Sequence, residues 1–199
     1  MAQTPSTFLL PLGEPAPAFR LPDPSARVHT LDDFAGRRAL VVMFICNHCP
    51  FVKHIRAELA RLARDYQPRE VGFVAINSND VTAYPDDSPA RMADEARDAG
   101  YTFPYLFDES QEVAKAYKAS CTPDFFAFDA ERHLAYRGQL DDSRPPSKSG
   151  GNTIPVSGAD LRAALDAILE RKPVTRPMKP SIGCNIKWKP GNQPAYVTA

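Results

Sequence analysis

The fold of this chain is decided by one stretch of its sequence, which reads Arg38-Ala39-Leu40-Val41-Val42-Met43-Phe44-Ile45-Cys46-Asn47-His48-Cys49-Pro50-Phe51. Residues 38–45 form a continuous apolar run of β-prone residues, which is typical of a strand covered on both faces in a parallel sheet. From Phe51 onward, apolar residues recur at helical spacing with charged residues between them. Pro50 suits the first turn of a helix. The stretch therefore predicts a strand that passes through a cysteine-containing turn directly into a helix.

The segments around this stretch complete an α/β pattern. A second buried strand is predicted at residues 71–77, which gives a right-handed βαβ unit. Helices and a hairpin follow it along the chain. They are expected at 88–100 (helix beginning at Ser88-Pro89), 108–118 (helix capped by Asp108), 125–128 with 134–137 (β-hairpin) and from 157 onward (last helix). Residues 138–155 are expected to form a loop.

Composition limits the class of protein. The 199 residues suit a single domain over 1–199, with 173–199 as an irregular tail. Hydrophobic residues make up 43% of the chain and charged residues 24%, which is ordinary for a globular protein. Lys plus Arg and Asp plus Glu number 24 each, so no net field favours nucleic acid or an anionic membrane. No apolar run approaches the ~18 residues of a membrane span, and no basic segment precedes Phe8-Leu9-Leu10. A cytoplasmic location is expected.

The pair Cys46-Asn47-His48-Cys49 is the main candidate for chemistry. Four cysteines in a long cytosolic chain point to redox or metal chemistry rather than to a structural disulfide framework. A thiol at a helix N-terminus faces unpaired backbone N–H groups and the positive end of the helix dipole. Such a site lowers the thiol pKa from about 8.5 toward roughly 7 or below, which makes the cysteine a good leaving group.

The identity of the attacking thiol stays open at this point. Cys49 directly precedes Pro50 and the helix, so the helix field acts most strongly on Cys49. A Cys-x-x-Cys interpretation also permits Cys46 to attack, with His48 biasing the site toward thiolate. A third alternative is that both cysteines are simply small buried residues.

Other polar residues are weaker candidates. Cys121 and the distal Cys184 are further candidates to resolve Cys49, and Cys184 alternatively belongs to a segment that anchors the tail to the core. Three potential soft metal ligands, Cys46, His48 and Cys49, lie within four residues, but a fourth ligand is lacking and no metal is expected. The pairs Asp86-Asp87 and Asp141-Asp142 are expected to be solvated turn residues, and His54 a solvated helix residue. No phosphate loop or dinucleotide motif is found, so no cofactor is expected.

Several segments carry a resemblance that covers nearly the whole chain. They are Leu12–Phe19, Leu31–Gly36, Phe44–Lys53, Val74–Asp80, Thr122–Phe125 and Ser181–Trp188. Together they resemble the thioredoxin superfamily, and within it the AhpC/TSA-type, peroxiredoxin-like redoxins known as thiol-disulfide isomerases or thioredoxins. The resemblance implies a thioredoxin-like three-layer α/β fold, with a central mixed β-sheet flanked by helices, a redoxin N-terminal extension and an irregular C-terminal tail.

The resemblance also implies roles for individual residues. Pro123 is then the cis-proline that faces the active-site cysteine and shapes the substrate groove. A gapless comparison with reductases of the pattern Val-Val-Leu-Asn-Phe-Trp-Ala-Ser-Trp-Cys-Pro-Pro-Cys places Cys49 on their first cysteine and Val52 on their second. Aligned on Cys49 with the Pro-x-x-x-Thr-x-x-Cys motif of peroxiredoxins, this chain carries Val42 and Cys46 in place of the proline and the threonine.

Three functional hypotheses follow. The leading one is a thiol-disulfide oxidoreductase in which Cys49 attacks a protein or small-molecule disulfide, Cys46 resolves the mixed disulfide, and an external thiol reduces the enzyme again. The second is a thiol peroxidase with an antioxidant role, in which a peroxide oxidises Cys49. The third is a metal-binding module. No nucleic acid or membrane partner is expected, and a homodimer is an option because peroxiredoxin-like relatives often form one.

Overall fold

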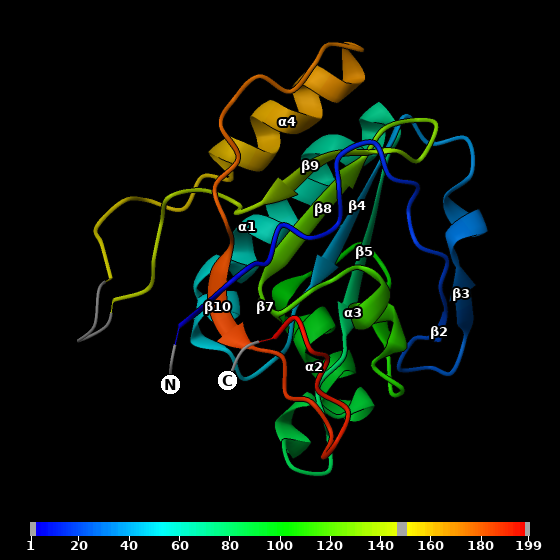
Figure 1. The fold of residues 1–199 in the computed structure, drawn as a ribbon, viewed down its shortest axis with the longest axis vertical. Coiled ribbons are helices and arrows are strands. Elements are labelled where there is room, and N and C mark those ends of the chain that lie inside the picture. Colours follow the sequence, from blue (N-terminus) through cyan, green and yellow to red (C-terminus); the bar gives the residue numbers. More distant parts are fainter. Residues whose placement is uncertain (1–2, 147–150, 198–199) are drawn as a thin grey trace.

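The computed structural model describes residues 3–146 and 151–197, and its centre is a five-stranded sheet (Figure 1). The strands lie in the order β6-β5-β4-β8-β9. Their bounds are β4 Ala39–Phe44, β5 Val71–Asn77, β6 Tyr105–Phe107, β8 Asp124–Phe128 and β9 Leu134–Gly138. Strands β4, β5 and β6 are parallel to one another, whereas β8 pairs antiparallel with both of its neighbours, β4 and β9. The expected mixed sheet and the βαβ unit are both confirmed.

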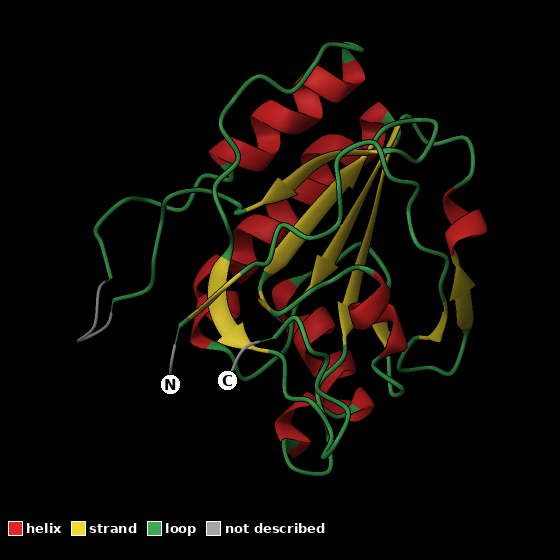
Figure 2. Cartoon of the chain, in the orientation of Figure 1, coloured by secondary structure: helices red, strands yellow, loops and turns green. Residues whose placement is uncertain are grey.

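Helices cover both faces of this sheet and give three layers (Figure 2). One face packs against α1 (Pro50–Tyr66), α2 (Pro89–Ala99) and α4 (Ala159–Leu169). The other face packs against α3 (Glu112–Ala116) and the N-terminal segment. That segment contains β2 (Arg20–Pro22), β3 (Val28–Thr30) and a 3-10 turn at Leu31–Phe34. Because both faces are covered, the central strands must be apolar on both sides, as the sequence of β4 is.

The junction between β4 and α1 forms as its sequence predicts. All six residues of β4 are buried. Cys49 has extended backbone angles (φ −67°, ψ 124°) and is the N-cap of α1, with Pro50 in the first turn. Proline fits there because its missing N–H has no partner within a helix. The first helical turn therefore begins at the second cysteine of the motif.

The helix expected at 108–118 is shorter than predicted, and its N-cap is a different residue. The helix expected at 108–118 is only α3, Glu112–Ala116, because Gln111 adopts a left-handed conformation at its start (φ 66°). Gln111, not Asp108, is the N-cap residue, but Asp108 Oδ2 accepts a hydrogen bond from the Ala114 N–H in the first turn of α3 and another from the Ser78 hydroxyl. The carboxylate of Asp108 thus joins the end of β5 to the start of α3.

The C-terminal tail is more regular than expected. It contains a strand, β10 (Ile182–Asn185), which lies between β1 (Thr4–Pro5) and β7 (Cys121–Thr122) in a separate antiparallel sheet. Figure 1 shows β10 beside β7, close to the N-terminal end of α1. The prediction of an irregular tail is therefore wrong for this strand.

The expected loop at 138–155 contains Asp141, which is buried rather than solvated. Its carboxylate accepts hydrogen bonds from the N–H groups of Ser143, Ser157 and Gly158, and it thereby fixes the start of α4. Residues 147–150 of this loop lie outside the described residues.

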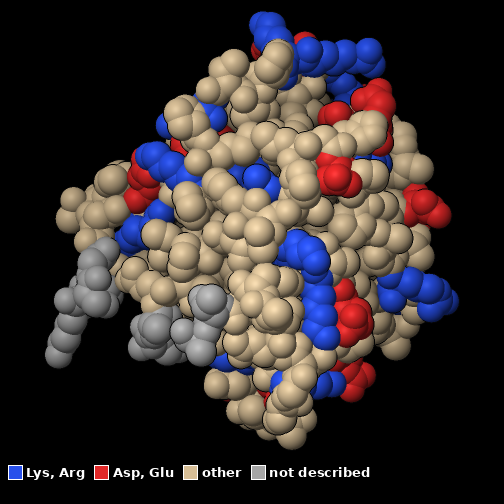
Figure 3. Space-filling model, in the orientation of Figure 1, with Lys and Arg blue, Asp and Glu red and all other residues tan. Residues whose placement is uncertain are grey.

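The surface carries no dominant charge on the face drawn in Figure 3, where positive and negative side chains are scattered among neutral ones. Within residues 3–146 and 151–197, no helix has the length and apolar character needed to cross a membrane.

Candidate active site

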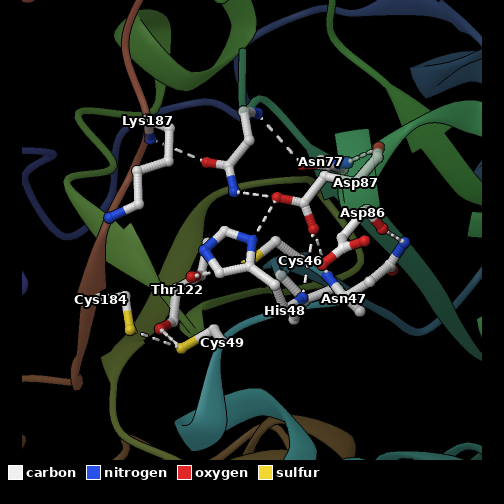
Figure 4. A network of polar contacts seen from close by, with 12 residues as sticks. Cys46, Asn47, His48, Cys49, Asn77, Asp86, Asp87, Thr122, Cys184 and Lys187 are labelled. Carbon is white, nitrogen blue, oxygen red and sulfur yellow. Dashed lines mark hydrogen bonds and ion pairs between the residues drawn. The ribbon is translucent and has the colours of Figure 1, made fainter. Parts of the chain in front are cut away.

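The sulfur of Cys49 is the centre of a buried thiol cluster (Figure 4). Cys49 has an exposed fraction of 0%. Its Sγ lies 3.1 Å from Cys184 Sγ and 3.2 Å from the carbonyl oxygen of Thr122. The three residues come from the α1 N-cap, from β10 and from β7 respectively. The cluster thus joins segments that are far apart in the sequence.

The thiols of Cys46, Cys49 and Cys184 have very different acidities. Hydrogen bonds from the thiols of Cys184 and Cys46 hold the pKa of Cys49 well below its ordinary value, and they outweigh the effect of burial. The backbone N–H groups of Val52 and Cys184 act in the same direction. The pKa of Cys46 and the pKa of Cys184 are both raised, in each case chiefly by the hydrogen bond to Cys49. These directions favour a thiolate at Cys49 over one at Cys46 or Cys184.

The other predicted site residues lie around this cluster. Cys46 is buried, and its Sγ lies 3.2 Å from the hydroxyl of Thr122. The Thr122–Pro123 peptide bond is cis, as the family resemblance implied. Cys121 is buried with its Sγ 3.7 Å from the carbonyl oxygen of Pro123, and burial raises the pKa of its thiol. Cys121 therefore contacts the proline loop.

A small groove opens beside Pro123. Its lining includes Phe51 and His54 of α1 and Ile182 of β10. His54 was expected to be solvated, but its Nε2 lies 2.7 Å from the hydroxyl of Ser143. The groove gives the proline loop an open side next to the first turn of α1.

Asp87 fixes the turn between the two cysteines. Its Oδ1 accepts hydrogen bonds from the backbone N–H groups of Asn47 (2.8 Å) and His48 (3.2 Å). Its Oδ2 accepts one from the Asn79 side chain (2.7 Å) and lies 2.6 Å from His48 Nδ1. Burial raises the pKa of Asp87, but the hydrogen bonds from His48 and Asn79 prevail and lower it. The expectation that Asp87 is solvated is wrong, because its side chain is fully buried.

Further polar contacts extend from Asp87. The Asn77 side chain donates to the Asp87 carbonyl oxygen (2.7 Å), and the Asn47 side chain donates to the Asp86 carbonyl oxygen (2.9 Å). The Tyr105 hydroxyl donates to Asn47 Oδ1 (3.0 Å). These bonds tie the turn to the loop that follows β5 and make its backbone rigid.

His48 points its Nδ1 at Asp87 and stacks on Tyr84, with ring centroids 5.4 Å apart. Its Nε2 is buried and has no hydrogen-bond partner among residues 3–146 and 151–197. The Asp87 carboxylate therefore fixes the orientation of the ring.

One group of side chains has the composition of a metal site. Ligand atoms of Cys46, His48 and Asp87 lie within 4.8 Å of one another. In this arrangement both oxygens of Asp87 already accept hydrogen bonds, and His48 Nδ1 is directed to one of them. The group is therefore organised as a hydrogen-bonded pair beside a thiol.

The tail reaches the same region through its backbone. The N–H of Lys187 donates to Asn79 Oδ1 (2.8 Å), and its carbonyl oxygen accepts from the N–H of Asp80 (2.8 Å). Its ammonium lies over the ring of Tyr84, 5.4 Å from the centroid. Figure 4 shows Lys187 and Cys184 on the same side of the turn.

Sequence reasoning singled out Cys46 and Cys49, named Cys184 as a distal candidate to resolve Cys49 and took Pro123 from the resemblance, but it missed Asp87. The segment Val74–Asp80 belonged to the family resemblance, and its Asn77 and Asn79 now prove to contact Asp87. That motif was the available signal for a polar network at this place.

Known proteins resemble this chain at several levels. The model of the AhpC/TSA family matches residues 12–137. A protein of Mycobacterium tuberculosis that is provisionally named a peroxiredoxin is 33% identical over 116 residues, which are 58% of this chain and 68% of that protein.

One solved structure extends the similarity to nearly the whole chain. An uncharacterized conserved protein of Geobacillus kaustophilus is 57% identical, with a TM-score of 0.90 over 96% of this chain and 98% of that one. The thioredoxin domain of a thiol-disulfide oxidoreductase from Bacteroides vulgatus is 16% identical, with a TM-score of 0.55 over 64% of this chain and 88% of that one. The second likeness confirms the expected thioredoxin-like fold.

Proposed function

The chain belongs to the AhpC/TSA family, and from that premise we propose that it is a thiol-disulfide oxidoreductase whose attacking group is the Cys49 thiolate. The observation that carries the proposal is the position of Cys49 Sγ at the N-cap of α1, within hydrogen-bond reach of a second thiol. A cysteine in this position is ionised at neutral pH and is also a good leaving group. Both properties suit disulfide exchange.

Cys46 and Pro123 complete the proposed site. Cys46 is the first cysteine of the Cys-x-x-Cys motif and is a hydrogen-bond partner of Cys49. The carbonyl oxygen of Thr122, which precedes the cis peptide bond, lies 3.2 Å from Cys49 Sγ. Pro123 is the next residue and lines the groove, where it can shape the approach of a disulfide.

The proposed substrates are protein or small-molecule disulfides, with an external thiol as reductant. The reaction needs no cofactor, because the two electrons come from cysteine thiols. A cytoplasmic site of action and a homodimeric state are further parts of the proposal, and neither nucleic acid nor membrane is expected as a partner.

An insulin-reduction assay with dithiothreitol as the external thiol tests this proposal. We expect turnover by the wild-type protein, complete loss in Cys49→Ser, and activity like wild type in Cys121→Ser, whose sulfur contacts the proline loop. Wild-type activity in Cys49→Ser would contradict the assignment of the attacking thiol.

A second candidate function is thiol peroxidase activity at the same sulfur. The observation that favours it is the complete burial of Cys49, because a buried thiolate is more accessible to a small oxidant than to a protein disulfide. Hydrogen peroxide would oxidise Cys49 to a sulfenic acid, which a neighbouring thiol condenses to a disulfide. Peroxide consumption measured on wild type and Cys49→Ser tests this candidate, and consumption that survives the substitution excludes it.

A further inference from the structure

We infer that Cys184, carried on the tail strand β10, is the residue that resolves Cys49, so that the first disulfide formed in each catalytic cycle is Cys49–Cys184. This inference rests on the proposed function and names the second reacting group. Its basis is the distance of 3.1 Å between the two sulfurs. A disulfide bond is about 2.05 Å long, so the two sulfurs need to approach by only about 1 Å.

The position of Cys184 is set by backbone hydrogen bonding on both sides of β10. Cys184 is paired with Thr122 of β7, and Gly183 with Thr4 of β1. Beyond the strand, the N–H of Ile186 donates to the carbonyl oxygen of Ser120 (3.0 Å). The strand is therefore part of the folded body, and the thiol is presented to Cys49 without a prior rearrangement of the tail.

Gly183 explains how β10 comes so close to the proline loop. A Cβ atom at this position would lie 1.9 Å from the carbonyl oxygen of Thr122, which no side chain can tolerate. The same carbonyl oxygen lies 3.2 Å from Cys49 Sγ. Glycine thus permits the close approach that brings the neighbouring Cys184 into contact with the reacting sulfur.

Charge distinguishes Cys184 from Cys46, the other thiol that contacts Cys49. The negative charge of Asp87 disfavours a thiolate at Cys46, whereas the positive charge of Lys187 favours one at Cys184. The pKa of Cys184 is raised mainly by its hydrogen bond to the Cys49 thiolate. Once Cys49 is bound in a mixed disulfide, that thiolate no longer exists, and the proton of Cys184 is released more readily.

The exchange then proceeds in two balanced steps. The Cys49 thiolate attacks a substrate disulfide, which forms a bond between Cys49 and one substrate sulfur and releases the other as a thiolate that takes up a proton. The Cys184 thiolate next attacks Cys49 Sγ, which forms the Cys49–Cys184 bond and releases the second substrate thiolate. The substrate gains two electrons, and an external dithiol restores both cysteines.

Dithiodipyridine, a small neutral disulfide that releases a coloured thiopyridone, tests the inference. Each reduced variant is mixed with a limiting amount of the probe, and the adducts are mapped by mass spectrometry without reduction. In wild type and Cys121→Ala we expect rapid release of both thiopyridones and a Cys49–Cys184 disulfide. In Cys46→Ala, which removes a hydrogen-bond partner of Cys49, the first thiopyridone should be released more slowly, but the disulfide that forms should again be Cys49–Cys184. In Cys184→Ala the pyridyl adduct should persist on Cys49 at least about tenfold longer, because the nearby attacking thiol is missing.

The outcomes separate this inference from the proposed function. An adduct that persists in Cys46→Ala but not in Cys184→Ala, with a Cys46–Cys49 disulfide in wild type, would overturn the role of Cys184 and leave Cys49 as the attacking thiol. A Cys49→Ser variant that reacts as fast as wild type would overturn the proposed function itself. Cys184→Ser, which keeps a small polar side chain, serves as the second variant and must also retain the adduct.

Discussion

Two regions meet at the turn that carries Cys49, and they hold it in different ways. The loop after β5 contributes Asp87, a charged side chain whose oxygens accept four hydrogen bonds from the turn and from Asn79. The tail contributes β10, which is held by backbone pairing and presents a single thiol to the sulfur. The two regions therefore act differently: the loop holds the backbone of the turn by hydrogen bonds, and the tail places a thiol beside Cys49 that lowers the pKa of its sulfur.

We expect the largest loss of stability from a substitution in the loop after β5. Asp87→Ala removes the acceptor for two backbone N–H groups and two side chains, and it leaves them buried without partners. Removal of one member of such a buried charged network destabilises a protein by about 3–5 kcal/mol. Urea unfolding followed by circular dichroism measures this loss. Asp86→Ala is the matched control, since the Asp86 side chain is exposed, and equal losses in both variants would refute the role of the Asp87 carboxylate.

We expect the next largest loss of stability from a substitution in the tail strand β10. Gly183→Ala places a methyl group against the Thr122 carbonyl oxygen and forces β10 away from β7. Overpacking of this kind destabilises by about 1–3 kcal/mol, and it also separates Cys184 from Cys49. Urea unfolding and the rate of Cys49–Cys184 closure measure the two consequences. Asn185→Ala, at an exposed position of the same strand, should change neither; a normal closure rate in Gly183→Ala would show that the close approach is dispensable.

A third test sharpens the claim that the tail sets the acidity of the sulfur. The hydrogen bond from Cys184 is the largest cause that lowers the pKa of Cys49. A hydrogen bond to a charged group contributes about 1.5–3 kcal/mol, so Cys184→Ala should raise the pKa of Cys49 by about one to two units. The thiolate then becomes protonated at a higher pH as the solution is acidified.

Ultraviolet absorbance of the thiolate, titrated against a Cys49→Ser blank, measures this shift. Cys121→Ala provides the control, because it removes another buried thiol, whose sulfur is hydrogen-bonded to the Pro123 carbonyl oxygen rather than to Cys49. An unchanged titration in Cys184→Ala would assign the acidity of Cys49 to the helix terminus instead of the tail.

We expect the smallest loss of stability from a substitution at Lys187, where the tail contacts the loop after β5. Lys187→Met keeps the aliphatic stem but removes the charge that lies over the ring of Tyr84. A cation–π contact at a partly exposed site contributes about 0.5–1 kcal/mol, so the loss of stability should stay within that range. Thermal unfolding measures it. A loss as large as that of Asp87→Ala would mean that this charge, rather than the backbone contacts of Lys187, joins the tail to the loop.

The two regions also differ in how far the sequence predicts them. The strand, the turn and α1 follow from local patterns: a continuous apolar run, proline at the first helical position and apolar residues at helical spacing. These signals act over a few neighbouring residues. They were therefore sufficient to place Cys49 directly before a helix and Cys46 in the turn that leads to it.

Asp87 and β10 depend on partners that are distant in sequence. Asp87 lies in a polar segment that looks solvated, and its burial is possible only because donors from residues 47, 48 and 79 surround it. Strand β10 has four residues and pairs with strands of two residues each, which is too short for a periodic pattern. A glycine next to a cysteine in such a segment indicates nothing until the Thr122 carbonyl oxygen is seen against it.

The sequence separation of Cys49 and Cys184 makes the oxidation state of the protein a property of the whole chain. A bond between them would close a loop of 135 residues, which in the chain-entropy account of crosslinks restricts the unfolded state by roughly 5 kcal/mol. A bond between Cys46 and Cys49 would close a loop of a few residues, and the same account gives roughly 2 kcal/mol. Oxidation through the tail would thus turn most of the polypeptide into a covalent ring, and resistance to unfolding would itself report whether the protein has reacted.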